Sequence, residues 1–378
     1  MAREWIDAHA SALAARAERD LEALVAVSSP SGDVPGAEEA VAVAAALAAD
    51  VAEASRVPCS SPDHAPDLEL RVRGPGSRRI LLVGHLDTVV PHSAHVAPEH
   101  HGRRVRGSGT IDMKGGVAIS LGVLRALAER AELGEALLLL VNDEEWRVGP
   151  FEHGPRFADF DACLCFEAGE RSPSGDDAVI VRRKAAGTLR VTARGRSAHS
   201  GSAPDKGVNA LLALAEAARS GSALHDPGGP ERLTVVPTIM RSGEALNVVP
   251  ADGELVFDVR ADRLEAFRPV LGAIPAEVGG AALSAVMQRE WPGMDSREVA
   301  AGVLASAGDL LGRPVVAAQR GGASDASHFS AAGIALTIDG LGPRGGHAHA
   351  PEEFIDLDSL VPRAEVALAV ADAVLRLS

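Results

Sequence analysis

The stretch that decides the fold covers residues 79–116, and its first nine residues, 79–87, read RILLVGHLD. The branched apolar run at 80–83 predicts a buried strand. If extended geometry persists past this strand, His85 and Asp87 point to the same side, because side chains alternate along a strand. The Asp87 carboxylate can then fix the tautomer of the His85 imidazole, which is how a metal-binding histidine is usually supported.

A second polar cluster closes the same stretch, where residues 107–116 read GSGTIDMKGG and an apolar segment with helical spacing follows at 117–127. Asp112 therefore lies on a glycine-rich turn that leads into a helix. Such a turn could cradle a phosphate, but Asp112 stands where the anion would sit, and neither dinucleotide nor P-loop spacing is complete. A carboxylate together with a histidine favours a cation.

Length and charge limit the class of protein. A chain of 378 residues suggests two domains. The formal net charge of −15 argues against nucleic acid or an anionic membrane as a partner, since both require clustered Lys and Arg. No apolar run reaches membrane-spanning length, and the N-terminus lacks the apolar core of a signal peptide, so we expect a cytoplasmic protein. Cys163 and Cys165 alternate along an apolar run and are expected to be buried thiols.

Periodicity predicts strands that alternate with helices in both ends of the chain. The expected helices cover 8–27, 36–54, 116–131 and 360–377, and the expected strands cover 79–84, 136–141, 162–166 and 335–338. This alternation predicts an α/β fold with a mostly parallel sheet, in which ligands bind outside the carboxyl ends of the strands. Three of the strands end in acidic or imidazole groups, at His85, at the run 142–145 (NDEE) and at Glu167.

The acidic run after the strand 136–141 carries a geometric clue. Neighbouring residues on a regular strand face opposite ways, so Glu144 and Glu145 can serve one site only from a turn just past the strand. One glutamate can then ligate a metal while the other carries a proton. A solvated acidic turn is the alternative for this run alone, but it is one of four such clusters.

The middle of the chain, residues 183–291, has a different pattern. Alternating strands are expected at 187–194, 254–260 and 281–287, and helices at 207–219 and 262–275. We expect this block to be an inserted α+β domain within a discontinuous catalytic domain formed by 1–182 and 292–378. The last segment adds the run GGHAHAPEEF at 345–354.

Four ordered motifs, GHxD, GxGxxDxKGG, DEE and a late HAPxE, give the chain a family resemblance over nearly its whole length. The sequence resembles the two-zinc exopeptidases that include glutamate carboxypeptidase, acetylornithine deacetylase, succinyl-diaminopimelate desuccinylase and aminoacylase. The resemblance implies a zinc-exopeptidase-like, mostly parallel sheet flanked by helices, with a smaller inserted α+β dimerisation or lid domain. The loop 31–33 and the junction 166–169 favour the glutamate carboxypeptidase-like branch.

The resemblance also implies roles for individual residues. Asp112 would bridge two metals, with His85 and Glu167 on one metal and Glu145 and His349 on the other. Asp87 and Glu144 would be the catalytic residues, with Glu144 as the general base.

Other implied roles concern the late histidine and the substrate. The tail motif selects His349 over His347 as the metal ligand. His199, Asn247 and Arg260 would bind the substrate carbonyl and a terminal carboxylate, and the histidine commonly crosses over from the partner subunit. A solvated turn histidine is the alternative for His199. The family also implies a cis peptide between Asp112 and Met113.

The function expected from this resemblance is a dimetal hydrolase with two Zn²⁺ per chain, for which Co²⁺ or Mn²⁺ could substitute. It would act as a metallopeptidase that cleaves an amide bond next to a free carboxylate. An N-acyl amino-acid deacylase is the alternative, and a non-catalytic metal-binding protein is disfavoured by the presence of Glu144. We expect a small peptide or N-acyl amino acid as substrate and a homodimer. Residues 146–149 depart from the small glycine-containing turn that often follows the DEE motif, which leaves the pocket shape open.

Overall fold

The computed structural model describes residues 2–147 and 149–377. The chain separates into two compact units, each described by itself below. Unit 1 contains residues 1–182, 295–319 and 324–378, and unit 2 contains Arg183–Met294 and Arg320–Ala323. The middle block expected as an inserted domain, 183–291, falls within unit 2.

Unit 1 is built on a six-stranded sheet with the order β1-β2-β6-β3-β7-β17. Its strands are β1 (Glu53–Val57), β2 (Asp67–Arg73), β3 (Arg78–His85), β6 (Leu133–Val141), β7 (Ala162–Cys165) and β17 (Thr337–Ile338). The pairs β6–β3, β3–β7 and β7–β17 are parallel, whereas β1–β2 and β2–β6 are antiparallel. The mostly parallel α/β sheet predicted from the sequence is therefore confirmed.

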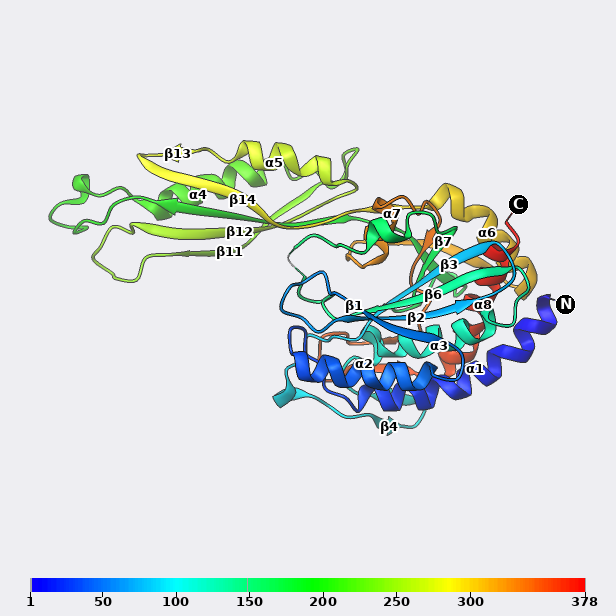
Figure 1. Ribbon diagram of the computed structural model, residues 1–378. Helices are drawn as coiled ribbons and strands as arrows, with labels where there is room; N and C mark the ends of the chain where they lie inside the picture. Colours follow the sequence, from blue (N-terminus) through cyan, green and yellow to red (C-terminus); the bar gives the residue numbers. More distant parts are fainter. Residues whose placement is uncertain (1, 148, 378) are drawn as a thin grey trace. The chain divides into compact units, whose positions relative to one another are not determined.

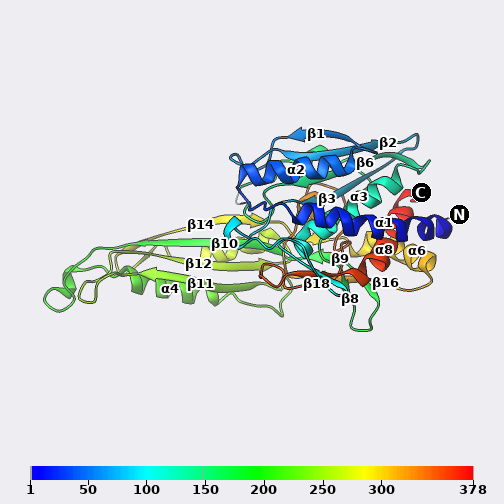
Figure 2. The same cartoon turned by 90° about the horizontal axis from the view of Figure 1, so that it is seen from below.

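Helices cover this sheet and explain the apolar character of its strands. They are α1 (Ala2–Val25), α2 (Val34–Ala48), α3 (Gly115–Leu127), α6 (Arg297–Leu311), α7 (Ala326–Ala331) and α8 (Leu360–Leu375). Helices α1, α2 and α3 cover one face of the sheet (Figures 1 and 2). Residues 80–83 of β3 are fully buried. Cys163 and Cys165 on β7 are buried as well, and both are free thiols, as expected.

Short strands complete unit 1 and flank the loop 347–353, which carries His349. A small antiparallel sheet has the order β18-β19-β5-β4. Its strands are β18 (Gly345–Gly346), β19 (Phe354–Asp356), β5 (Arg104–Arg106) and β4 (Glu99–His101). The remaining strands outside unit 2's sheet are β8 (Glu170–Arg171), β9 (Asp177–Arg183), β15 (Met294–Asp295) and β16 (Val315–Arg320).

Unit 2 is a five-stranded antiparallel sheet with the order β11-β12-β10-β14-β13. Its elements are β10 (Ala185–Arg194), α4 (Ala210–Ser222), β11 (Thr234–Ser242), β12 (Asp252–Ala261), α5 (Arg268–Ala273), β13 (Glu277–Val278) and β14 (Ala281–Trp291). Figure 1 shows α4 and α5 along one face, where Leu189, Val191 and Phe257 are buried. Arg190 and Thr192, which alternate with them, are exposed, so the sheet is apolar on one face and polar on the other.

Two sequence expectations are corrected by the structure, and one strand of unit 2 was not expected. The helix expected at 36–54 ends at Ala48, because Glu53 already begins β1, whose ladder with β2 overrides the helical propensity of the alanines. The helix expected at 262–275 is a 3₁₀ turn (Leu264–Phe267) followed by α5, and Pro269 stands at the start of α5, where it removes a backbone donor. The strand β11 was missed because Pro237 argues against a strand, yet an edge strand with a register shift accommodates it.

One close approach in unit 1 gives a test of this packing. A Cβ added to Gly116 of α3 would lie 1.8 Å from the carbonyl oxygen of Phe166, just after β7, whereas one added to Gly302 of α6 meets nothing within 4 Å. We expect Gly116→Ala to lower the free energy of unfolding by about 3 kcal/mol or more, because backbone must move. Gly302→Ala should raise it by about 0.5–1 kcal/mol. Urea denaturation measures both, and equal effects of the two changes would contradict this packing.

Candidate metal centre

The candidate site of unit 1 forms at the carboxyl ends of three neighbouring strands. Strand β3 lies between β6 and β7, so the residues that end these strands meet at one edge. His85 is the last residue of β3, Glu144 and Glu145 lie on the turn after β6, and Glu167 follows β7 by two residues. The predicted position of the acidic run on a turn past the strand is therefore confirmed.

Asp112 faces two histidines with its two oxygens. It lies in the turn Thr110–Lys114 before α3, where the backbone of Asp112 and Met113 is not helical, and the peptide bond from Asp112 to Met113 is cis, as expected. Asp112 Oδ1 is 3.2 Å from His85 Nε2, and Asp112 Oδ2 is 3.0 Å from His349 Nε2. A carboxylate with one donor group on each oxygen has the geometry that a bridge between two cations requires.

Each histidine also faces a second carboxylate. His85 Nε2 is 3.8 Å from Glu167 Oε1, and His349 Nε2 is 3.3 Å from Glu145 Oε2. The five residues predicted as metal ligands are thus brought together, in the two groups that the family resemblance implied. His347 lies elsewhere in the same loop, with its ring 5.7 Å from that of Phe354.

Asp87 supports this arrangement from behind. The Nδ1 atom of His85 is 3.0 Å from the Asp87 carbonyl oxygen and 3.3 Å from its carboxylate. The carboxylate also accepts the backbone N–H groups of Glu144 at 3.2 Å and Glu145 at 3.1 Å. Asp87 therefore orients the histidine and the acidic turn together.

Glu353 was not singled out from the sequence, although it fixes the loop that carries His349. This loop joins β18 to β19, and the buried Glu353 carboxylate accepts the backbone N–H groups of Gly109, Ile111 and Asp112 at 2.8–3.0 Å. One side chain therefore holds the Asp112 turn against the His349 loop. Its signal in the sequence is the last residue of the HAPxE motif.

The electrostatics of the donor set favour positive charge. Burial lowers the pKa of His85, but hydrogen bonds to Asp112 and Asp87 outweigh it and raise that pKa well above the usual range. Hydrogen bonds to Asp112 and Glu145 raise the pKa of His349 to about 10. Burial raises the pKa of Glu144 well above its usual value, against the opposing effect of His85. The site thus attracts cations, and it takes up protons where no metal is bound.

The residues present fit a metal ion by a second criterion. Among the residues that the structure describes, Glu145 Oε1 is buried without a hydrogen-bond partner, while Glu145 Oε2 faces His349. The donor atoms of His85, Asp112 and Glu145 all lie within 4.8 Å of one another. Imidazole and carboxylate donors suit Zn²⁺, and a buried carboxylate oxygen needs a partner.

The three predicted substrate-binding residues all belong to unit 2, at two separate places. The backbone N–H of Ser200 donates to the Asn247 carbonyl at 2.9 Å, so His199 and Asn247 lie on paired loops. Arg260 lies near the far end of β12, where it donates to Asp258 and to the Gly321 carbonyl. The eight steps along β12 from Asp252 to Arg260 span roughly 26 Å of strand, so the two places are distant within one chain.

The turn of His199 fixes which of its ring nitrogens carries a proton. Its Nδ1 accepts the backbone N–H groups of Gly201 at 3.1 Å and Ser202 at 3.2 Å. The proton therefore lies on Nε2, and this exposed donor is suited to an anionic oxygen.

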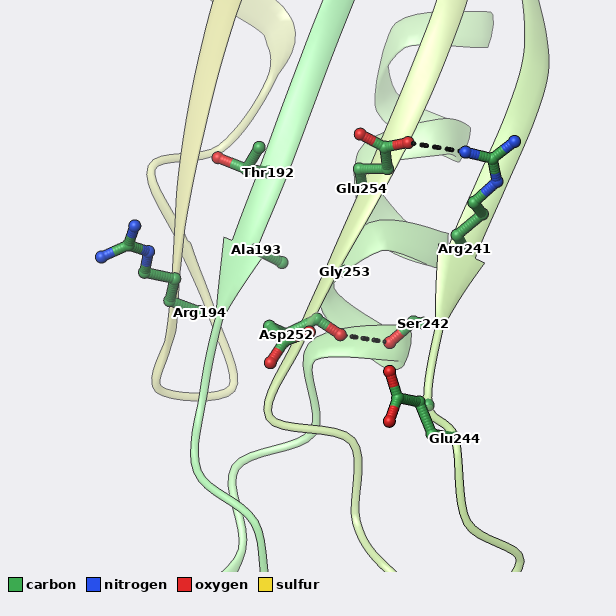
Figure 3. Close-up of a pocket in the computed structure, with 10 residues that line it drawn as sticks. Thr192, Ala193, Arg194, Arg241, Ser242, Glu244, Asp252, Gly253 and Glu254 are labelled. Atoms are coloured by element: carbon green, nitrogen blue, oxygen red, sulfur yellow. Dashed lines mark hydrogen bonds and ion pairs between the residues drawn. The ribbon is translucent and has the colours of Figure 1, made fainter.

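A hollow of about 480 Å³ lies elsewhere on the sheet of unit 2, between β10, β11 and β12 (Figure 3). Figure 3 shows Arg241 reaching toward Glu254, to which it donates at 3.5 Å. None of the predicted site residues lines it. This hollow is therefore separate from the candidate site.

Comparison with known proteins identifies the family. The model of peptidase family M20/M25/M40 matches residues 81–373, which include every motif described above except the loop 31–33. The chain belongs to this family, and it is a metal-dependent hydrolase.

Individual relatives are similar over different shares of the chain. Carboxypeptidase G2 of Pseudomonas sp. strain RS-16 is 27% identical over 316 residues, which is 78% of this chain and 73% of the relative. A succinyl-diaminopimelate desuccinylase of Rhodospirillum centenum is 33% identical over 246 residues, or 59% of this chain and 61% of the relative. The family therefore includes relatives that differ in substrate.

Solved structures share the fold. The M20 family metallo-carboxypeptidase Sso-CP2 from Sulfolobus solfataricus matches with a TM-score of 0.74 at 17% identity, covering 96% of this chain and 99% of that one. No helix among the described residues has both the length and the apolar character needed to cross a membrane.

Metal binding should be visible as stability, because an ion that binds only the folded chain shifts the unfolding equilibrium. We expect chelation to lower Tm and added Zn²⁺ to restore it, with about 2.7 kcal/mol gained when free Zn²⁺ is 100 times Kd. Calorimetry and elemental analysis measure the two effects. Glu145→Gln should bind about one ion fewer per chain than the native protein.

The control for this experiment is Glu22→Gln. Glu22 belongs to a surface group with Glu18 and His100, in which His100 Nε2 lies 2.6 Å from Glu22 Oε1. We expect no change in metal content from Glu22→Gln. A loss of metal from this variant, with normal content in Glu145→Gln, would move the metal centre away from the strand ends.

Proposed function

We propose that the protein is a dimetal hydrolase, with two Zn²⁺ per chain, that cleaves an amide bond next to a free carboxylate, as a glutamate carboxypeptidase does. The observation that carries this proposal is the position of Glu144. Glu144 lies on the same turn as Glu145, one residue before it, and Asp87 holds the backbone of both glutamates. A donor set with an adjoining proton carrier is what amide hydrolysis needs.

The metal ions would be held by the five ligand residues, and when bound they supply the Lewis-acid activation of water and of the amide carbonyl. Glu144 performs the proton transfers. Its carboxylate takes a proton from the attacking water and gives it to the leaving nitrogen, so that one amide and one water become a carboxylic acid and an amine.

The second candidate is an N-acyl amino-acid deacylase, and the similarity to a succinyl-diaminopimelate desuccinylase favours it. Both activities use the same centre and differ in which side of the amide is recognised. A panel of dipeptides, N-acyl-glutamates and N-acetyl amino acids, compared by kcat/KM with Zn²⁺ or Co²⁺ present, separates them. The leading proposal expects the highest values for substrates with a C-terminal carboxylate-bearing residue such as glutamate.

Glu144→Gln tests the proton carrier directly. The amide cannot accept a proton, so we expect kcat to fall by roughly 10²–10⁴-fold while the metal content stays at two per chain. The matched control is Glu152→Gln, which makes the same change at an exposed residue of the same segment and should leave kcat unchanged. Substantial turnover in the Glu144→Gln enzyme would rule out this role.

We further infer that unit 2 forms a homodimer that completes the site in trans. Strand β11 is an edge strand with exposed apolar side chains at Val236, Ile239 and Met240, and edge strands of this kind are stabilised by pairing. His199 and Arg260 are too far apart along the sheet to hold one small substrate together. In a dimer, the His199 of one chain could act on a substrate that the Arg260 of the other chain holds, so the two residues need not be close within one chain.

Mixing two inactive chains tests the trans arrangement. His199→Ala removes the oxyanion donor and Glu144→Gln removes the base, and each change alone should lower the rate roughly a hundredfold or more. A heterodimer of the two contains one site with both native residues, so partial activity should return after subunit exchange. A monomer in sedimentation analysis, or a mixture that stays as inactive as its parents after verified exchange, would refute the proposal.

A further inference from the structure

A buried arginine stands directly behind the acidic turn of the candidate centre. Arg147 is 1% exposed, and its guanidinium donates to two buried carboxylates, Asp143 and Asp325. Asp143 immediately precedes Glu144, whereas Asp325 is the residue before α7, far along the chain. The guanidinium also lies 4.5 Å from the ring centroid of Phe151.

This arginine closes the turn as well as filling the space behind it. The backbone N–H of Arg147 donates to the Asp143 carbonyl at 2.8 Å, and its Nε donates to the Asp143 carboxylate at 3.1 Å. The hydroxyl of Ser61 donates to the other oxygen of the same carboxylate at 2.7 Å. Both oxygens of Asp143 are thus held, and Glu144 and Glu145 lie inside a closed loop of five residues.

The turn is consequently held from two sides. Asp87 accepts the backbone N–H groups of Glu144 and Glu145 on the side of the donor set. Arg147 binds the side chain of Asp143, the residue just before them, and that of Asp325. A buried ion pair often contributes little to stability, because removing its charges from water is costly. The contacts of Arg147 next to Glu144 and Glu145 therefore indicate a role in the geometry of these two glutamates.

We propose that Arg147 is a positioning residue of the metal centre, which keeps Glu145 in place as a ligand and Glu144 in place as the proton carrier. The part of this inference that concerns Glu144 rests on the proposed hydrolase activity. The part that concerns Glu145 does not, because metal binding can be measured without substrate. Arg147 falls in the segment 146–149, where the sequence departs from the small glycine-containing turn that often follows the DEE motif.

Arg147→Met tests the inference by removing every guanidinium contact while keeping an unbranched side chain. It also leaves Asp143 and Asp325 buried without their cation, which can prevent folding. A charge-balanced variant, Arg147→Met/Asp143→Asn/Asp325→Asn, leaves no unpaired buried carboxylate. It still lacks the guanidinium contacts that position the turn. Arg147→Lys keeps the charge and lacks the planar fork that binds two carboxylates.

Arg130→Met is the matched control. Arg130 also pairs with a fully buried aspartate, Asp372, and its guanidinium lies 4.6 Å from the ring centroid of Trp5. It stands on the segment between α3 and β6, at the opposite end of β6 from the acidic turn. If Arg147→Met acted only through a general loss of packing, Arg130→Met would therefore have the same effects.

Two measurements need no substrate. Cobalt(II) titration followed by its visible spectrum gives the metal affinity, and the fluorescence of Trp146 reports the turn, because Trp146 is 63% exposed while Trp291 is 2% exposed. We expect the charge-balanced variant and Arg147→Lys to bind cobalt(II) roughly 10- to 100-fold more weakly than the native protein, with an altered spectrum and altered Trp146 emission. Arg130→Met should lower Tm and leave the cobalt(II) affinity and the cobalt(II) spectrum unchanged. Its tryptophan emission does not serve as a control, because the guanidinium of Arg130 contacts the ring of Trp5.

Kinetics on the metal-loaded proteins complete the test. A displaced Glu144 should lower kcat roughly a hundredfold with little change in KM, whereas a structural defect would lower the active fraction only. Native cobalt(II) affinity and native kcat in a folded charge-balanced variant would overturn the inference. If that variant does not fold, the same native values in Arg147→Lys would overturn it. Absence of hydrolysis by the native enzyme would refute the proposed function and leave the metal-affinity test of Arg147 intact.

Discussion

Repulsion between carboxylates that share one small volume is the constraint on which unit 1 depends. Asp112, Glu145 and Glu167 converge on two imidazoles, with Glu144 beside them, and burial makes each negative charge costly. Folding alone does not remove this cost. The raised pKa values of His85 and His349 show how strongly the arrangement attracts positive charge. The divalent cations proposed for this site would supply that charge at the point where the strands end.

The carboxylates around the centre divide into those that face the donor set and those that organise its backbone. Asp87 and Glu353 belong to the second kind, because both accept backbone N–H groups from the segments that carry the ligands. Asp143 and Asp325 meet the guanidinium of Arg147 behind the acidic turn. Ligand positions are therefore fixed by hydrogen bonds at several points of the backbone, which is how a precise constellation is held on turns.

Much of unit 1 could be predicted because the chemistry follows local patterns. The apolar run before His85, the acidic run before Glu145 and the glycine-rich turn at Asp112 each carry their own signal. The cis peptide at Asp112 came from the family resemblance, since nothing in the composition of the turn requires it. Strand β1 escaped prediction because its pairing with β2 overrides the helical propensity of the alanines before it, and β11 because Pro237 interrupts its strand pattern.

The contacts behind the ligands could not be predicted, for a different reason. Arg147 and Asp325 are 178 residues apart, and only the folded chain brings α7 to the turn after β6. A sequence shows that a charged residue is present but not that it will be buried beside another. The separation of Arg260 from His199 is likewise a property of strand length and register in unit 2.

The carboxylate of Glu353 links two ligand segments that are far apart in the chain. Because it holds the N–H groups of Ile111 and Asp112 from a position four residues after His349, opening of the loop between β18 and β19 would free both segments in one event. The amide hydrogens of Ile111 and Asp112 would then exchange with solvent only when this loop opens. Release of a metal ion and local unfolding would be the same cooperative step, so the centre would exchange its ions on the timescale of loop opening.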